Sequence, residues 1–206
     1  VAEDRVYSDW ASLIEREKSR VDFIAVCTPN DSHYAITKAA LAAGLDVMCE
    51  KPLSMTLEEA AELKAIASER GRILAIPFTY SGFPMVKLAR DLVRKGELGG
   101  ISKIVLEYQQ GSFRKIDFTK PLDKRNSWKM DPSRSGASCV VADIGVHGFH
   151  LIEYVTGLEI KDLARTGVEG RAGTHHVSIL EPTAKDKLIG LGDVKGFAVK
   201  FLFGKD

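Results

Sequence analysis

The first 80 residues alternate between short apolar runs and amphipathic segments, and this alternation restricts the fold more than any other feature of the sequence. Apolar runs occupy 21–27, 45–50 and 72–80, and two segments with helical spacing, 32–44 and 54–71, separate them. Each of these two segments ends at a glycine, as helices commonly do. Strands and helices in alternation, with short connections, predict a parallel sheet wound with helices. The first run, VDFIAVC, predicts a strand buried on both faces.

The pattern changes after this point, and the rest of the sequence predicts mixed α and β structure. An amphipathic segment at 84–100 predicts a helix, and a long alternating segment at 101–113 predicts an antiparallel strand with one solvated face. Helical spacing returns at 140–157, which again ends at a glycine. Residues 114–138 are polar and predict a long loop, which in a compact domain is usually functional or mobile. No element is predicted for 171–195, although the tail contains β-like runs such as GFAVKFLF.

Composition argues against two classes of partner. The chain carries 29 basic and 28 acidic residues, so it lacks the basic surface that binding to nucleic acid requires. No apolar run approaches the ~20 residues that span a bilayer. The sequence also lacks a polybasic patch and a signal peptide, so we expect no membrane partner. Three scattered cysteines, Cys27, Cys49 and Cys139, predict reduced, packed thiols in a cytoplasmic protein.

Polar residues follow the predicted parallel strands at the edge of the sheet where ligands bind in wound α/β folds. The second strand ends in CEKP, which places Glu50 and Lys51 at this edge, ahead of Pro52. Most loop lysines beside a proline are solvated, but a lysine at this edge can donate a hydrogen bond to a substrate hydroxyl. The first strand ends in TPN, 28–30, which either holds a cofactor or forms an ordinary turn that caps the next helix.

Asp143, His147 and His150 have the spacing i, i+4 and i+7, which places them within about 60° of one another on one helix face. A carboxylate one turn from an imidazole orients the ring and favours a role in proton transfer. Three alternatives stay open: Asp143 as a helix N-cap, His150 as a packed core histidine, and a metal site. Further metal ligands are not evident, because His175 and His176 lie where no element is predicted, so we expect no metal.

Two segments of the sequence together resemble a known family. The segment AVCTPNDSHYAITKAALAAGLDVMCEKPLSMTLEEA, followed by ADIGVHGFH, is similar to the Gfo/Idh/MocA oxidoreductases, and the resemblance runs from about Arg5 to about Gly157. It implies an enzyme that uses NAD or NADP to transfer a hydride to or from a hydroxyl carbon of a sugar, inositol or related polyol.

The resemblance implies a catalytic role for three residues. Lys51 corresponds to the family's catalytic lysine, which contacts the reacting hydroxyl. Asp143 corresponds to its substrate-binding acid, and His147 to its catalytic histidine. We expect His147 to be the general base and Lys51 to polarise the oxygen, with the reverse assignment as the alternative.

Further contacts with the cofactor and the substrate follow from the same resemblance. The turn along the nicotinamide half of the cofactor corresponds to Thr28, Pro29, Asn30 and His33. Glu50 and Pro52 flank the same pocket, where the Lys51–Pro52 peptide bond is expected to be cis. The implied substrate contacts are Lys51, Trp128, Asp131, Asp143, His147 and His150.

The sequence departs from the family at its start, because it contains no opening strand and no G-x-G-x-x-G turn. We therefore expect a fragment of class α/β. Residues 1–79 would form a partial dinucleotide-binding (Rossmann) domain. Residues 80–206 would form an incomplete α+β substrate domain with an open, mostly antiparallel sheet. The acidic or basic residue that reads the ribose is expected in the missing segment, so the sequence leaves both NAD and NADP open.

The resemblance also implies a homo-oligomer, a dimer or a tetramer, formed through the sheet of the second domain. Two other functions remain possible on the same fold, since fold does not determine function. One is a non-catalytic regulator that binds a sugar or a nucleotide, and the other is an inactive truncated fragment.

Overall fold

The computed structural model describes residues 3–108, 119–121, 127–136, 141–160, 179–180, 186–194 and 197–204. The chain forms two compact units. The first comprises Val1–Pro77 with Leu122–Asp143, and the second comprises Phe78–Pro121 with Ile144–Asp206. The described parts of 122–143 therefore belong to the first unit, whereas the sequence analysis placed them in the second domain. No helix within the described ranges is long and apolar enough to cross a membrane.

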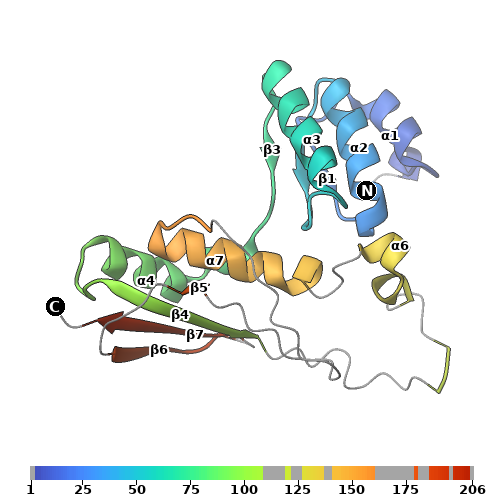
Figure 1. Ribbon diagram of the computed structural model, residues 1–206. Coiled ribbons are helices and arrows are strands. Elements are labelled where there is room, and N and C mark those ends of the chain that lie inside the picture. Colours follow the sequence, from blue (N-terminus) through green and yellow to red (C-terminus); the bar gives the residue numbers. More distant parts are fainter. Residues whose placement is uncertain are drawn as a thin grey trace. The chain divides into compact units, whose positions relative to one another are not determined.

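The first unit contains a parallel sheet of three strands, as the alternating pattern predicts (Figure 1). The strands β1 (Phe23–Val26), β2 (Asp46–Cys49) and β3 (Leu74–Ala75) lie in this order in the sheet. Three helices accompany them: α1 (Trp10–Glu17), α2 (Asn30–Ala42) and α3 (Leu57–Glu69). The strand β3 is shorter than the apolar run that predicts it.

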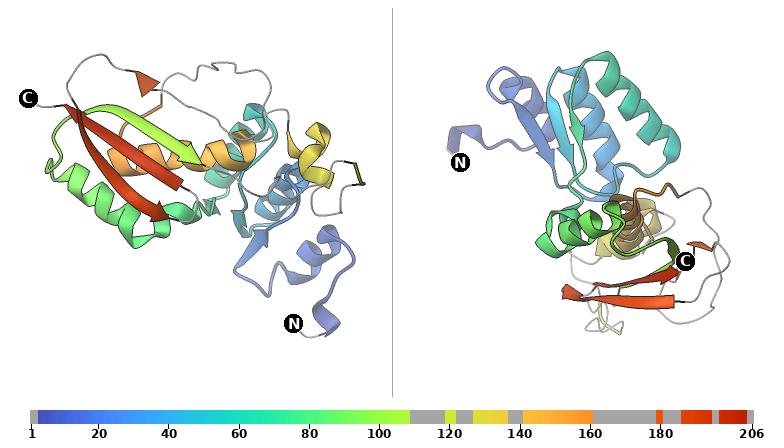
Figure 2. Two further views of the ribbon diagram at one scale, coloured as in Figure 1. Left: turned by 90° about the horizontal axis from the view of Figure 1, so that it is seen from below. Right: turned by 90° about the vertical axis from the view of Figure 1, so that its left-hand side faces the viewer.

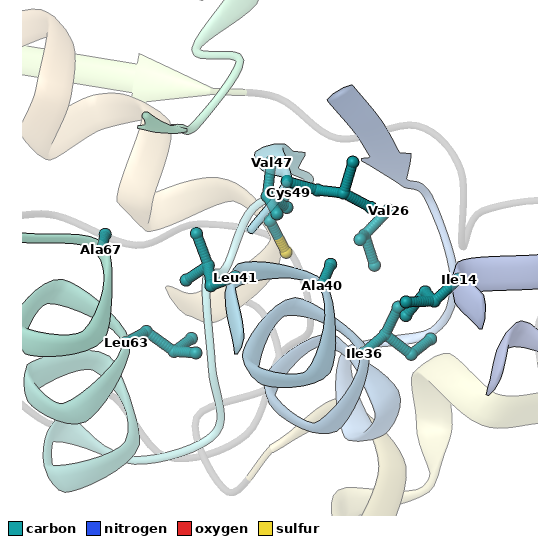
Figure 3. Packing of buried hydrophobic residues seen from close by; sticks show 10 residues of the cluster. Ile14, Val26, Ile36, Ala40, Leu41, Val47, Cys49, Leu63 and Ala67 are labelled. Atoms are coloured by element: carbon teal, nitrogen blue, oxygen red, sulfur yellow. The ribbon is translucent and has the colours of Figure 1, made fainter. Parts of the chain in front are cut away.

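The core of the first unit lies between the sheet and its helices (Figure 3). Val26 of β1 is 2% exposed, and Val47 and Cys49 of β2 are also buried. They pack with apolar residues of all three helices, including Ile14, Ile36, Ala40, Leu41, Leu63 and Ala67. Burial of these side chains supplies most of the free energy that holds helices on a sheet.

Burial of β1 on both faces was a wrong prediction. Phe23 is 55% exposed and Ala25 is exposed, whereas Val26 is buried. Successive side chains of a strand point to opposite faces. In the described part of the unit the core covers only the face that carries Val26.

The two cysteines that the structure describes differ in their exposure to solvent. Cys49 is buried, whereas Cys27, the residue after β1, is exposed, so the prediction that Cys27 is packed was wrong. Both are free thiols. Burial raises the pKa of the Cys49 thiol to about 11, and Thr37 acts weakly in the opposite direction.

The second unit contains an antiparallel sheet of four strands in the order β5-β4-β7-β6. These are β4 (Ile101–Tyr108), β5 (Ile179–Leu180), β6 (Asp186–Val194) and β7 (Phe197–Gly204). The strand β4 confirms the prediction of an antiparallel strand in the alternating segment that begins at Ile101. The strand β7 includes the run GFAVKFLF from Phe197 onward. In contrast, β5 and β6 lie within 171–195, where no element was predicted.

Two helices, α4 (Pro84–Arg94) and α7 (Val146–Thr156), lie on one face of this sheet (Figures 1 and 2). Their buried residues form one cluster with Ile104 of β4: Val86, Ala89, Leu151, Ile152 and Val155. Gly148 allows close packing here, because a Cβ atom at this position would lie 3.1 Å from Cδ2 of Leu106. The helix α7 ends at Gly157, as predicted, in the left-handed conformation with φ of 74°.

The described part of the polar loop 114–138 contains a 3-10 turn, Trp128–Met130, and the short helix α6 (Pro132–Ser135). The helix α6 lies against α2 within the first unit (Figure 1). An ion pair joins Arg134 to Asp31 at 3.0 Å. The loop is therefore attached to the start of α2, next to the carboxyl end of β1.

Candidate active site

The loop after β2 places Lys51 at the carboxyl edge of the parallel sheet. The backbone N–H of Glu50 donates to the carbonyl oxygen of Val26 at 2.9 Å, which continues the pairing of β1 and β2 by one residue. The Glu50 carboxylate then accepts from the backbone N–H of Lys51 at 3.1 Å. The Lys51–Pro52 peptide bond is cis, which confirms the expectation from the resemblance. The pairing with β1 thus extends to Glu50, and Lys51 is the next residue along the chain.

Lys51 is held by Asp143, which lies 92 residues further along the chain in the same unit. Its Nζ donates to Oδ1 of Asp143 at 2.6 Å and to the backbone oxygen of Asp143 at 2.7 Å. The two side chains are 16% and 24% exposed. Lys51 is therefore not a freely solvated loop lysine, and the pair keeps an ammonium group at the sheet edge with limited access to water.

Asp143 does not cap a helix and does not lie on α7. Residues Val141–Gly145 form a π-helical turn, and α7 begins after it with Gly145 as its N-cap. The prediction that Asp143, His147 and His150 share one α-helix is therefore wrong for Asp143, because only the two histidines lie on α7. Single π turns occur frequently at functional sites. The N-cap alternative for Asp143 is wrong.

A second lysine, Lys129, also faces Asp143, and the sequence analysis missed it. Its Nζ lies 3.7 Å from Oδ2 of Asp143 and 5.7 Å from the ring centroid of Trp128. One carboxylate therefore pairs with two ammonium groups, those of Lys51 and Lys129. The signal available in the sequence was only the position of Lys129 next to Trp128, in the loop that the resemblance assigns to the substrate.

Two other predicted site residues, Asn30 and Asp131, make well-defined contacts within the first unit. The Asn30 side-chain amide donates to the carbonyl oxygen of Ser135 at 2.9 Å and is buried. Asp131 is the N-cap of α6, where it accepts from the backbone N–H of Ser133 at 2.9 Å. The hydrogen bonds from Ser133 lower the pKa of the Asp131 carboxyl. Contact of Asn30 or Asp131 with a ligand stays a prediction.

Thr28 and His33 complete the predicted cofactor turn with Pro29, the N-cap of α2. Thr28 is exposed, and its hydroxyl accepts from Ser32 at 2.7 Å. His33 is buried, and its two ring nitrogens lie 2.7 Å from the carbonyl oxygen of Pro52 and 2.8 Å from that of Thr28. The turn therefore offers Thr28 to a ligand but encloses the His33 ring.

The second unit carries His147, on the first turn of α7, among aromatic rings. His147 is 7% exposed. The ring of Tyr80 meets it edge to face with centroids 4.7 Å apart, and Phe78 lies 6.0 Å away in the same manner. Neither aromatic residue was predicted for the site. Both lie at the end of the apolar run 72–80, a few residues after β3, and this position was the available signal.

His150 is stacked in a column of rings in the second unit. Its imidazole lies 4.2 Å from Phe78 and 5.7 Å from Tyr154, both in stacked geometry. Arg90 of α4 also lies over the Tyr154 ring, with its Cζ 4.6 Å from the ring centroid. Burial lowers the pKa of His150, and Glu153 partly opposes this effect. The core alternative for His150 thus fits its half-buried, stacked ring.

The described residues contain no group of three or more His, Cys, Asp or Glu side chains that could hold a metal ion. His175 and His176, which the sequence analysis considered as ligands, lie outside the described residues. The first unit therefore brings Lys51, Asp143 and Lys129 together. In the second unit, aromatic rings surround His147 and His150.

Two family models match most of the chain. Residues 1–78 match a model described as an oxidoreductase family with an NAD-binding Rossmann fold. Residues 86–187 match a model described as the GFO/IDH/MocA C-terminal domain.

Named relatives agree with these matches. The uncharacterized oxidoreductase YfiI of Bacillus subtilis is 32% identical over 164 residues, which cover 78% of this chain and 42% of YfiI. Levoglucosan dehydrogenase of Pseudarthrobacter phenanthrenivorans is 29% identical over 150 residues, or 73% of this chain and 36% of that enzyme. The crystal structure of an inositol dehydrogenase homolog from Azotobacter vinelandii, complexed with NAD+, has a TM-score of 0.70 and 37% identity. That match covers 75% of this chain and 40% of the homolog, so the chain spans less than half the length of each relative.

Proposed function

Since this chain belongs to the Gfo/Idh/MocA oxidoreductase family, we propose that it is part of an NAD-dependent dehydrogenase acting on a sugar, inositol or related polyol. The observation that carries the proposal is the ion pair of Lys51 and Asp143, at 2.6 Å. It joins the EKP motif to the DIGVH motif, the two features on which the resemblance rests. Two of the relatives, the levoglucosan dehydrogenase and the inositol dehydrogenase homolog, support this substrate class.

NAD is the cofactor favoured by the family description and by the NAD+ complex of the Azotobacter homolog. The residues at the carboxyl ends of β1 and β2 suit such a group, because Cys27 and Thr28 are exposed there while the last residues of the two strands, Val26 and Cys49, are buried. Thr28, Pro29 and Glu50 would hold the nicotinamide half. When bound, the nicotinamide ring supplies the hydride acceptor or donor.

The contacts of Lys51 explain how it would act on a substrate. An ammonium group has three N–H donors, and two of them are directed to Asp143. The described part of the chain provides no recorded acceptor for the third, which would donate to the oxygen of a substrate hydroxyl. Because Asp143 holds the group by both its carboxylate and its backbone oxygen, the ammonium is oriented before a substrate arrives. Such preorganisation lowers the barrier for a step in which charge develops on that oxygen.

His147 would accept the hydroxyl proton as general base. It follows Asp143 by four positions in the sequence, and the aromatic rings of Phe78 and Tyr80 restrict the orientation of its imidazole. A ring held in one orientation suits directional proton transfer. The reverse assignment, with Lys51 as base and His147 as hydrogen-bond donor, uses the same residues.

The test replaces Lys51 and His147 by Ala, one at a time, in the full-length protein that contains this chain. We expect kcat/KM with NAD and a panel of inositols, sugars and levoglucosan to fall by about 10²–10⁴-fold in each variant. The control is Lys38→Ala, because Lys38 also forms a lysine–carboxylate pair, with Glu62 at 2.6 Å, but on the surface between α2 and α3. Its turnover should stay near that of the wild type.

Near-wild-type kcat/KM in both site variants would end the proposal. Binding of NADH without turnover of any polyol would instead support the regulator that the sequence leaves as an alternative. The homo-oligomer and the cytoplasmic location expected from the sequence remain part of this proposal, and sedimentation of the full-length protein tests the first of them.

A further inference from the structure

The His33 imidazole lies between the two loops that carry the candidate residues of the first unit. His33 belongs to the first turn of α2, which begins at Asn30. Its Nδ1 lies 2.7 Å from the carbonyl oxygen of Pro52, in the loop after β2. Its Nε2 lies 2.8 Å from the carbonyl oxygen of Thr28, in the loop after β1. One ring therefore connects the ends of two neighbouring strands.

These contacts leave the ring no polar atom for a ligand. The side chain is buried, and the residue is 1% exposed. Both partners are backbone carbonyl oxygens, which only accept hydrogen bonds. A neutral imidazole can donate to one of them, and the doubly protonated ring donates to both. In either form both nitrogens face the protein, so direct contact with a cofactor would require one of these contacts to break.

The contact with Pro52 bears directly on Lys51. Pro52 is the next residue in the chain, so the hydrogen bond to its carbonyl restrains the backbone from which the Lys51 side chain departs. On the other side of Lys51, the backbone N–H of Glu50 bonds to Val26. The Lys51 backbone is thereby held on both sides, and its ammonium can meet the two oxygen atoms of Asp143 at 2.6 and 2.7 Å.

We propose that His33 is a positioning residue that holds the loop of Lys51, rather than the cofactor contact implied by the resemblance. The inference rests on the proposed function, since it concerns the lysine that would act on the substrate hydroxyl. A small displacement of such a group is enough to slow a reaction by about 10²-fold. The ring acts on the reaction only through the position of Lys51.

Kinetics of His33→Gln and His33→Ala in the full-length protein test this inference. We expect kcat to fall by about 10-fold to 10²-fold, while KM for NAD changes little, with the smaller loss in His33→Gln because its amide can donate to one of the two carbonyls. In a Lys51→Ala background the His33 substitutions should have no further effect on kcat, because residues that act through one another are not additive.

Two outcomes of the kinetics would overturn the inference. One is full additivity of the His33 and Lys51 substitutions. The other is a change confined to KM for NAD, which would mark His33 as a cofactor contact. If His33→Ala fails to fold, His33→Gln alone provides the comparison.

A second readout does not depend on activity, so it separates failure of this inference from failure of the proposed function. Acetylation of lysines by acetic anhydride, read by peptide mass spectrometry, measures the access of reagent to Lys51 relative to Lys38. We expect Lys51 to react several-fold faster in His33→Gln than in the wild type, since the loop would release it from Asp143. An unchanged ratio would overturn the inference, even in a protein without dehydrogenase turnover.

Discussion

Lys51 and Asp143 show what sequence can and cannot reveal about single residues. No local pattern in the sequence connects two positions that are 92 residues apart. Lys51 and Asp143 were assigned to one site only because each belongs to a motif that resembles the same family. Lys129, Phe78 and Tyr80 belong to no such motif, so their contacts became evident only in three dimensions. His33 was assigned to the cofactor turn because of its position in the chain, but burial and hydrogen bonding decide what its ring can touch.

His150 gives the protein a specific sensitivity to acid. Burial lowers its pKa in the folded state, so the folded protein binds fewer protons than the unfolded chain, in which histidine has a pKa of about 6.5. The neutral His150 ring therefore contributes to the free energy of unfolding above about pH 6.5. This stabilisation is lost as the pH falls through the pKa of His150 in the folded protein. We expect the Tm of the wild type to decrease on acidification from pH 7 more steeply than that of His150→Phe, which keeps an aromatic ring between Phe78 and Tyr154. Parallel Tm–pH curves would contradict this.

At the scale of elements, the sequence predicted most helices and strands because apolar spacing and glycine stops are local signals. It failed where the result depends on neighbours. The open face of β1 depends on what packs against the sheet. The strand β6 contains Gly190 and Gly192, which interrupt its alternating pattern, and its pairing with β7 holds it in the sheet. The π turn at Val141–Gly145 also follows no local rule that helical periodicity could supply.

The end of α7 provides a test of one local rule. Gly157 has φ of 74°, and nothing lies within 4 Å of a Cβ atom placed there, so a substitution meets only backbone strain. We expect Gly157→Ala to lower the free energy of unfolding by about 1–2 kcal/mol, the penalty of the left-handed conformation. Gly82→Ala is the matched control, because Gly82 also has open space but no positive φ, and it should change stability by less than about 0.5 kcal/mol. Equal effects in urea unfolding would refute the explanation.

At the scale of the whole molecule, each unit has its own core, built around Leu41 in the first and around Val155 in the second. Units with separate cores can open separately. Leu41 is fully buried, so Leu41→Ala should destabilise its unit by about 2–5 kcal/mol. We expect faster hydrogen exchange in β1, β2 and α2 but not in β4 or α7, and the reverse pattern for Val155→Ala. Uniform acceleration in both units would show a single cooperative structure instead.

The unequal environments of Cys27 and Cys49 have a practical consequence. Alkylating reagents attack the thiolate, which is scarce for a buried group with a pKa of about 11 and inaccessible to bulky reagents. In full-length protein in which Cys139 and any cysteine outside this chain are replaced, a maleimide dye should therefore attach to Cys27, directly before Thr28 in the chain. If the dinucleotide binds at this turn as proposed, emission from that dye should change on its binding, even for variants that have lost all turnover.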